Sequence, residues 1–321
     1  SVQLTPFVSR ESTSPMQGTV AGFTAGGHDA SPPPIETNII DKFPFANELT
    51  AVDHGDLSAA RRLLSGQSSD TQGFVAGGYY APAGGNVNII EKYPFATNTT
   101  ATDHGDLTVA QRGGAGQSST THGFDSGGND PSASNVVEKF LFATNTTASD
   151  AGDLSVARTQ AAGQSSETEG YTTGGQLSPP FPFSPNEQTN VIDKFSFSSF
   201  VTASDVGDLT QVRARSSGQS SKTHGYSSGG IQNPPPVNFN TIDKFPFSSD
   251  TDATDVGDMV FIVNDSAAGQ NSREHGYISG GGGNGTYINT MIQRFPFATD
   301  TNASDVGNLT SKRGQNAGAQ D

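Results

Sequence analysis

One phrase recurs six times along this chain, at a spacing of about 50 residues. Its clearest copy, residues 86–128, reads NVNIIEKYPFATNTTATDHGDLTVAQRGGAGQSSTTHGFDSGG. Each copy of such a repeat forms one supersecondary unit, which buries its apolar face only against its neighbours. The repeat therefore predicts that the 321 residues fold as an array of six similar units.

Each unit contains four short segments with strand character. GYxxGG ends in a glycine pair, IDKFPF alternates apolar and charged residues, DxGDLTxxR follows a turn rich in Asp, Thr and Asn, and AGQSS leads into the next unit. Proline has no N–H group, so the prolines of IDKFPF are expected at a bulge, a sheet edge or a strand end. These are Pro44, Pro94, Pro246 and Pro296.

Four strands per unit, six units and no helical period predict an all-β fold, a six-bladed β-propeller with four-stranded antiparallel blades. An open β-solenoid is the alternative, but solenoid coils are shorter and lack these meander turns. We expect one propeller domain at residues 22–321 after a lead-in at residues 1–21. Within the lead-in, LTPFVSR at residues 4–10 resembles a strand four. It could reinforce the closure of the ring or pair with a neighbouring subunit.

Length varies almost entirely in one connection of the unit. Ten residues separate the IDKFPF aromatic from the DxGD aspartate in all six units, whereas 17 to 25 residues separate GYxxGG from that aromatic. In a meander the variable connection joins strands two and three, on the same face as the links between blades. Insertions confined to one face commonly mark a binding face, although surface loops also vary freely.

The candidate interaction surface therefore consists of the six variable loops. They span residues 28–38, 79–88, 129–135, 176–190, 231–240 and 282–289. Within them we single out the aromatic and polar side chains Tyr79, Tyr80, Asn129, Asp130, Phe181, Phe183, Asn186, Asn233, Phe239, Asn284 and Tyr287.

Composition argues against several classes of function. The absence of cysteine excludes disulfides, thiolate metal sites and cysteine nucleophiles. A formal net charge of −15 disfavours binding to nucleic acid or to anionic membranes, which depends on Lys and Arg at the contact. We find no secretory signal and no long apolar run, so we expect a soluble protein that does not insert into a membrane.

No constellation points to catalysis, and we expect neither a cofactor nor a metal. The DxGD aspartates could offer oxygen ligands to calcium, but Asp and Gly at this spacing are more typical of a turn. The serines of AGQSS recur in nearly every unit, with no single His and Asp beside one special copy, which argues against a nucleophile. The lysine before the IDKFPF aromatic is expected to pair with a carboxylate or to cover an aromatic ring.

The order of these segments resembles the kelch repeat. That family has a diglycine closing strand two, an aromatic in strand three and an arginine before the next blade. We match the arginine to Arg62, Arg112, Arg158, Arg213 and Arg313. The resemblance covers about residues 22–313 and implies a β-propeller. The strand-four tryptophan of the family is absent, and blade five has no arginine.

The particular wording, DKFPF with DVGDLT and GQSSKTHGYSSGG, is similar to kelch-type proteins among the structural genes of tailed phages that infect marine cyanobacteria. This resemblance implies a virion component, for example in the tail, assembled in the host cytoplasm. Its partners would be other virion proteins or further copies of itself.

We therefore expect a noncatalytic structural and interaction propeller, a phage tail or other virion component. The alternative is a carbohydrate-binding module that recognises a host receptor glycan through the variable loops. A third alternative, a cellular kelch adaptor, lacks any accompanying adaptor domain in this sequence.

Overall fold

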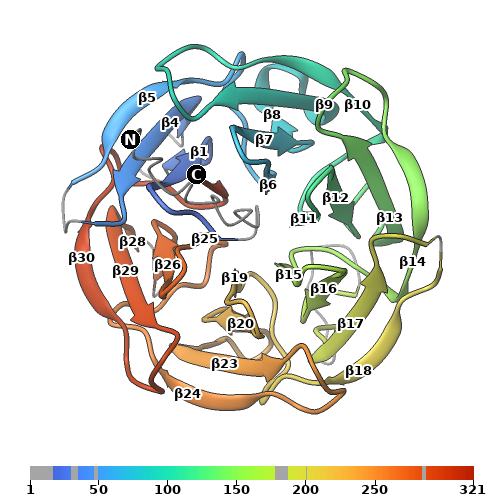
Figure 1. The fold of residues 1–321 in the computed structure, drawn as a ribbon, viewed down its shortest axis with the longest axis vertical. Coiled ribbons are helices and arrows are strands. Elements are labelled where there is room, and N and C mark those ends of the chain that lie inside the picture. The colour runs from blue at the N-terminus through green and yellow to red at the C-terminus, as the bar shows by residue number, and fades with distance from the viewer. Residues whose placement is uncertain (1–16, 30–34, 47–49, 178–186, 200, 284–286) are drawn as a thin grey trace, which may run out of the picture.

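The computed structural model describes residues 17–29, 35–46, 50–177, 187–199, 201–283 and 287–321. Six blades surround a central axis, and in each of them strand one lies nearest the axis (Figure 1). Every blade is an antiparallel sheet in which strands one to four pair in order. The structure thus confirms the six-bladed propeller. No helix in the described ranges is long and apolar enough to cross a membrane.

The strands follow the four phrases of the sequence. Strand one of blades 1 to 6 is β31 (Ala317–Gln320), β6 (Ser65–Ser68), β11 (Ala115–Ser118), β15 (Ala162–Ser165), β19 (Ser217–Ser220) and β25 (Ala268–Asn271). Strand two is β1 (Ala21–Ala25), β7 (Gln72–Ala76), β12 (His122–Ser126), β16 (Glu169–Thr173), β20 (His224–Ser228) and β26 (His275–Ser279).

Strand three corresponds to IDKFPF and strand four to DxGD. Strand three is β4 (Ile39–Pro44), β9 (Gly85–Pro94), β13 (Ser134–Leu141), β17 (Val191–Ser196), β23 (Thr241–Pro246) and β29 (Met291–Pro296). Strand four is β5 (Val52–Asp56), β10 (Thr102–Gln111), β14 (Ser149–Arg158), β18 (Ser204–Asp208), β24 (Thr254–Asp258) and β30 (Ser304–Asn308). All four prolines of IDKFPF are the last residue of their strand, one of the predicted positions.

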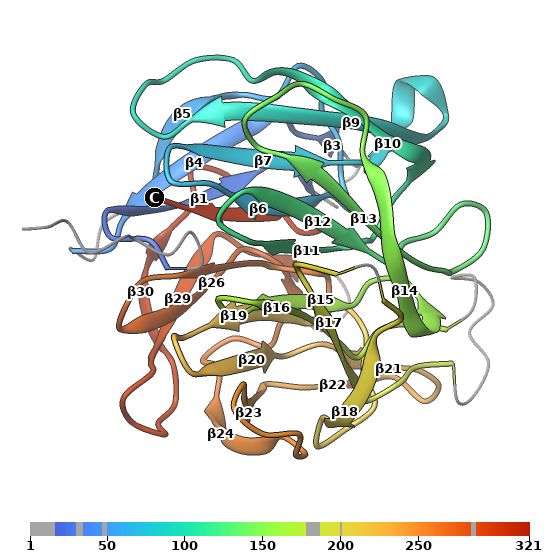
Figure 2. The same ribbon diagram turned by 45° about the vertical axis from the view of Figure 1, so that its right-hand side comes forward.

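Short strands and one 3-10 turn lie in the connections between strands two and three. They are β2 (His28–Asp29), β3 (Ile35–Glu36), β8 (Tyr79–Tyr80), the 3-10 turn η1 (Ala81–Ala83), β21 (Ile231–Gln232), β22 (Val237–Asn238), β27 (Gly282–Gly283) and β28 (Tyr287–Ile288). In Figure 2, η1 and the β21–β22 pair lie toward the right-hand side of the ring. We call this side the loop face.

The ring closes with strands from both ends of the described chain. In blade 1, β31 pairs with β1, with Gly22 opposite Gln320. The sequence of β31 is AGAQ, a sixth and degenerate copy of AGQSS in which Ala319 replaces the glutamine. The extra strand expected at residues 4–10 lies outside the described residues.

The AGQSS phrase ties neighbouring blades together at the axis. A Cβ on its glycine would lie 2.0–2.2 Å from the glycine carbonyl oxygen of the preceding blade. Its glutamine donates to the following blade, as Gln117 does to the Tyr171 carbonyl at 3.0 Å. Its first serine accepts from the preceding blade, as Ser118 Oγ does from the Ser68 N–H at 3.0 Å. The six glycines form what we call the glycine ring: Gly66, Gly116, Gly163, Gly218, Gly269 and Gly318.

An aromatic trio fills each interface between blades. The Phe74 ring of blade 2 stacks on Phe142 of blade 3 at a centroid distance of 4.7 Å and lies 5.7 Å from Phe140. An equivalent trio of strand-two and strand-three aromatics occurs at the other five interfaces. The regularly spaced aromatics are therefore the core that joins the blades.

Four interfaces also contain a buried arginine paired with a strand-three carboxylate of the next blade. The pairs are Arg61 with Glu91, Arg158 with Asp193, Arg213 with Asp243, and Arg313 with Asp41. Two of our five arginine matches are thus wrong. The buried position lies eight residues after the first aspartate of DxGD, as from Asp150 to Arg158, which selects Arg61 and Gln111 rather than Arg62 and Arg112.

The interface between blades 5 and 6 has lost both charges together. Val263 stands in place of the arginine and Gln293 in place of the carboxylate. Val263 packs in one apolar cluster with Ile278, and the Gln293 carboxamide accepts the Phe261 N–H at 2.8 Å. A neutral pair therefore replaces an ion pair at equivalent positions of the same chain.

The interface between blades 2 and 3 has lost only the arginine. Gln111 replaces it, while Glu138 remains and Asp125 adds a second carboxyl group, both 1% exposed. The Gln111 carboxamide nitrogen lies 3.4 Å from Asp125 and 3.3 Å from Glu138. Burial raises the pKa of both carboxyl groups, and the charge of Glu138 raises the pKa of Asp125 further. This interface is most stable when protonated.

This carboxyl pair predicts a stability that falls as pH rises above about 4, the ordinary carboxyl pKa of an unfolded chain. A carboxyl group whose folded pKa is raised contributes fully below its unfolded pKa, and loses that contribution as pH passes through the raised value. Asp125→Asn should match the parent in urea unfolding at pH 4 and exceed it at pH 8. A difference that is the same at both pH values would contradict this assignment.

Candidate functional site

The loop face carries two sets of connections that bond to each other around the axis. In each blade, the residue after the diglycine forms a backbone bridge to the link that enters the same blade from the preceding one. Examples are the Tyr79 N–H to the Arg62 carbonyl at 2.8 Å and the Asn129 N–H to the Arg112 carbonyl at 2.9 Å. The two connections therefore share a face, as the sequence predicted.

The six bridges repeat in the backbone but not in the side chains. The pairs are His28 with Gly314, Tyr79 with Arg62, Asn129 with Arg112, Gln176 with Thr159, Ile231 with Ala214, and Gly282 with Asn264. No two of these pairs are alike. We call this set of residues the bridge ring.

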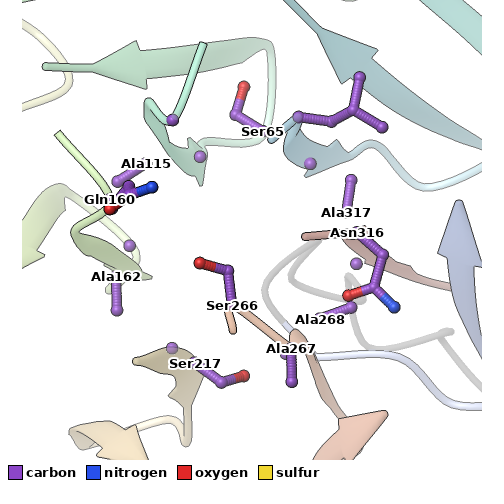
Figure 3. A pocket seen from close by; sticks show the side chains of 18 of the residues that line it. Ser65, Ala115, Gln160, Ala162, Ser217, Ser266, Ala267, Ala268, Asn316 and Ala317 are labelled. Carbon is purple, nitrogen blue, oxygen red and sulfur yellow. The ribbon is translucent and has the colours of Figure 1, made fainter. Parts of the chain in front are cut away.

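Inside the bridge ring, a cavity of about 100 Å³ forms the mouth of the central channel. Figure 3 shows Gln160 and Ser266 reaching toward the middle of the opening. One residue of each link between blades has a left-handed backbone: Leu63, Gly113, Gln160, Arg215, Ser266 and Gln315. Five of the six are not glycine, and because the left-handed position recurs in every link, it belongs to the repeated frame around the mouth.

These left-handed residues are joined by backbone hydrogen bonds around the mouth. The Gly113 N–H donates to the Leu63 carbonyl at 2.8 Å, and the Gln160 N–H to the Gly113 carbonyl at 2.7 Å. The link into blade 6 is one residue longer than the others, and there Gln315 bonds to Asp265 instead of Ser266. The mouth is too small for a drug-sized ligand, so a larger partner would contact the bridge ring outside it.

The most distinctive side-chain cluster of the bridge ring lies on blades 1 to 3. The Arg62 and Arg112 guanidiniums lie 4.9 and 5.2 Å from the centroid of the Tyr79 ring. Arg62 also forms an ion pair with Glu36 at 3.4 Å. Burial lowers the pKa of Arg112, and the charge of Arg62 lowers it further. Two cations therefore share one aromatic ring on the loop face.

The predicted interaction residues are placed as follows. Tyr79 and Tyr80 are half-buried in β8, Asn129 is buried, and Asp130 is exposed. Asn233 is half-buried, and its backbone N–H donates to the Gln188 side chain. Phe239 is buried. Tyr287 belongs to the short strand β28. Phe181, Phe183, Asn186 and Asn284 lie outside the described residues. Of the described ones, the structure brings Tyr79 and Asn129 together on successive bridges.

The DxGD segments form turns, as the sequence predicted. In all six copies the aspartate side chain accepts the N–H of the glycine two residues later, at 2.8–3.2 Å. These glycines have φ angles between 133° and 156°, where other residues are strained. Within the described ranges, no group of three or more His, Asp or Glu is arranged to hold a metal ion.

The lysine of IDKFPF forms contacts between neighbouring strands and blades. Lys194 and Lys244 form ion pairs with Asp250 and Asp300, and Lys42 lies 5.2 Å over the Phe23 ring. Both predicted roles of this lysine are confirmed.

Sequence reasoning missed the arginine cluster of the bridge ring. Arg62 and Arg112 were matched to the buried arginines, so their place on the loop face was not expected. A count from the DxGD aspartate would have shown that they lie one residue beyond the buried position.

No protein-family model matches the chain, and no curated protein is significantly similar to it.

Proposed function

We propose that the chain is a noncatalytic structural and interaction propeller whose loop face contacts its partner. The observation that carries this proposal is the bridge ring, in which one backbone arrangement presents a different pair of side chains in every blade. A constant frame that varies its side chains on one face is typical of repeat proteins that bind a partner. The serines of AGQSS and the buried arginines bond between blades and support the frame.

We place this module in a phage virion, with the tail as the favoured location. The support is the resemblance of DKFPF, DVGDLT and GQSSKTHGYSSGG to kelch-type proteins among phage structural genes. Its partner would be another virion protein or a second copy of the chain. Mass spectrometry of purified virions should detect the chain in amounts comparable to tail proteins. Its presence in the lysate but not in the virions would contradict this placement.

The second candidate is glycan binding by the same face. It is favoured by the two tyrosines of β8, a strand that pairs with the start of β9. There Asn86 lies opposite Tyr79, and its carboxamide donates to the Asn129 carbonyl at 2.8 Å. Tyrosine rings and amides are suited to sugar faces and hydroxyl groups. On a glycan array, replacing residues 176–190 by the shorter residues 129–135 should reduce binding. No binding, together with stable multimers, would favour the structural role instead.

A further inference from the structure

The bridge ring departs from six-fold repetition most strongly at its arginines. The position after the buried interface residue, which is an arginine in four links, Gln111 in the second and Val263 in the fifth, holds Arg62 and Arg112 in the first two links, but Thr159, Ala214, Asn264 and Gly314 in the others. The aromatic after the diglycine occurs only once, as Tyr79, between these two links. A frame that needed these side chains would repeat them, as it repeats the aromatic trio. The cluster is therefore not part of the repeated frame, which leaves it available for another role.

Arg112 is held in place without using its hydrogen-bonding groups. Its guanidinium lies 5.2 Å from the centre of the Tyr79 ring, and its backbone is fixed by the bridge to Asn129. Among the described residues, its side chain makes no hydrogen bond or ion pair to a protein acceptor. A guanidinium has five N–H donors in a planar fork that matches two oxygen atoms of a carboxylate or sulfate. In this position the planar fork of Arg112 is left for a ligand.

The charges around Arg112 also favour an anion. Arg62 lies beside the same ring, and its own countercharge is supplied by Glu36. The charge of Asp130 raises the pKa of Arg112, but within the described residues the two side chains form no ion pair. Burial and the neighbouring Arg62 lower the pKa of Arg112, so its charged form lacks full compensation. An oxyanion bound to the Arg112 guanidinium would supply the missing negative charge.

We propose that Arg112, whose guanidinium lies over the Tyr79 ring, binds a carboxylate or sulfate group of an acidic saccharide. The proposal rests on the loop face being the surface that contacts the partner. A saccharide is favoured over an acidic peptide because the adjoining β8–β9 hairpin carries Tyr80 and Asn86, whose hydroxyl and amide groups suit sugar hydroxyls.

Calorimetric titration with defined hexasaccharides tests the proposal. The probes are a hyaluronan hexasaccharide, which carries carboxylates, a chondroitin sulfate hexasaccharide, which also carries sulfates, and a chitin hexasaccharide, which is neutral. We expect saturable binding of at least one acidic probe and no binding of the neutral one. Binding of all three alike, or of none, would overturn the proposal. A hexaglutamate peptide that binds more tightly than both acidic saccharides would overturn the choice of a saccharide.

Two arginine variants make the test specific for this residue. Arg112→Gln should weaken binding of the acidic probe at least tenfold. Arg273→Gln removes the same charge from an exposed turn between strands one and two, on the opposite face, and should change affinity less than twofold. Equal losses in the two variants would indicate general electrostatic attraction and overturn the site. Arg112→Lys should restore only part of the affinity, because lysine keeps the charge but not the planar fork.

The loop graft separates this site from the proposed function. A graft that removes binding while Arg112→Gln retains it would place recognition on the loop face but not at this arginine. Resonances of the arginine side-chain Nε–H groups, followed by NMR during the titration, should show Arg112 shifting with saturation. Unfolding in urea shows whether each variant keeps the stability of the parent.

Discussion

Arg158→Ala should lower the free energy of unfolding by about 3–5 kcal/mol, the cost of breaking one side of a buried ion pair. Arg158 and Asp193 are both fully buried between blades 3 and 4. The guanidinium also donates to the Gly174 and Val191 carbonyls at 3.0 and 2.9 Å. Its removal leaves a buried carboxylate and two carbonyl oxygens without this donor. Urea unfolding at pH 7 measures the loss.

The chain itself supplies the control for this prediction. The interface between blades 5 and 6 has Val263 and Gln293 at the equivalent positions. Arg158→Val alone should be strongly destabilising, whereas Arg158→Val combined with Asp193→Gln should recover most of the lost stability. An apolar or neutral replacement of a whole buried pair is often tolerated, because no charge is left unpaired. Equal losses in the single and double variants would show that the pair is not coupled.

The blade could be predicted from the sequence because its phrases keep their spacing. The ten residues between the IDKFPF aromatic and DxGD fix a hairpin that lies against the next blade. The Gly105 position, for example, leaves no room for a side chain beside the Thr146 carbonyl. Insertions there would separate the blades. The variable connection lies on the loop face rather than between the strands of neighbouring blades, so its length is free to change, and this difference identified the loop face.

The identity of the buried arginine could not be predicted in the same way. In blades 1 and 2 the segment ends in two long polar residues, Arg61 and Arg62 or Gln111 and Arg112. Either member of each pair is chemically suited to meet a carboxylate. The choice depends on which side chain points between the blades, and a strand bulge at DxGD shifts that register. The spacing from Asp150 to Arg158 in blade 3 is the signal that resolves it.

The closing strand was missed for a related physical reason. Most of the AGQSS signal comes from the glutamine and serines, which bond to neighbouring blades. In β31 only the alanine and glycine remain in register, because Ala319 and Gln320 occupy the other two positions. What the fold requires at this place is the glycine, since Gly318 lies against the Gly269 carbonyl. A single small residue is too weak a signal to be recognised in a chain with 39 glycines.

Gly163→Ala should therefore be among the most damaging single-methyl changes in the chain, with an expected loss of about 2–3 kcal/mol, the upper range for overpacking. Its Cβ would lie 2.2 Å from the Gly116 carbonyl oxygen, which is backbone and cannot rotate away. The two strands are also fixed by bonds such as that from the Ser118 N–H to Ser165 Oγ at 3.0 Å. The steric clash could be relieved only if blades 3 and 4 separated at the axis.

Gly85→Ala is the matched control for this substitution. A Cβ at Gly85, on the loop face at the start of β9, has no heavy atom within 4 Å. It should change the free energy of unfolding by no more than about 0.5 kcal/mol, as is usual for surface positions. If Gly163→Ala were equally mild, the inner strands would be able to move apart, and close contact at the axis would not be what holds the ring. If the predicted contrast is observed, the glycine of AGQSS sets the spacing of the blades, while the aromatic trios and buried ion pairs stabilise the interfaces at that spacing.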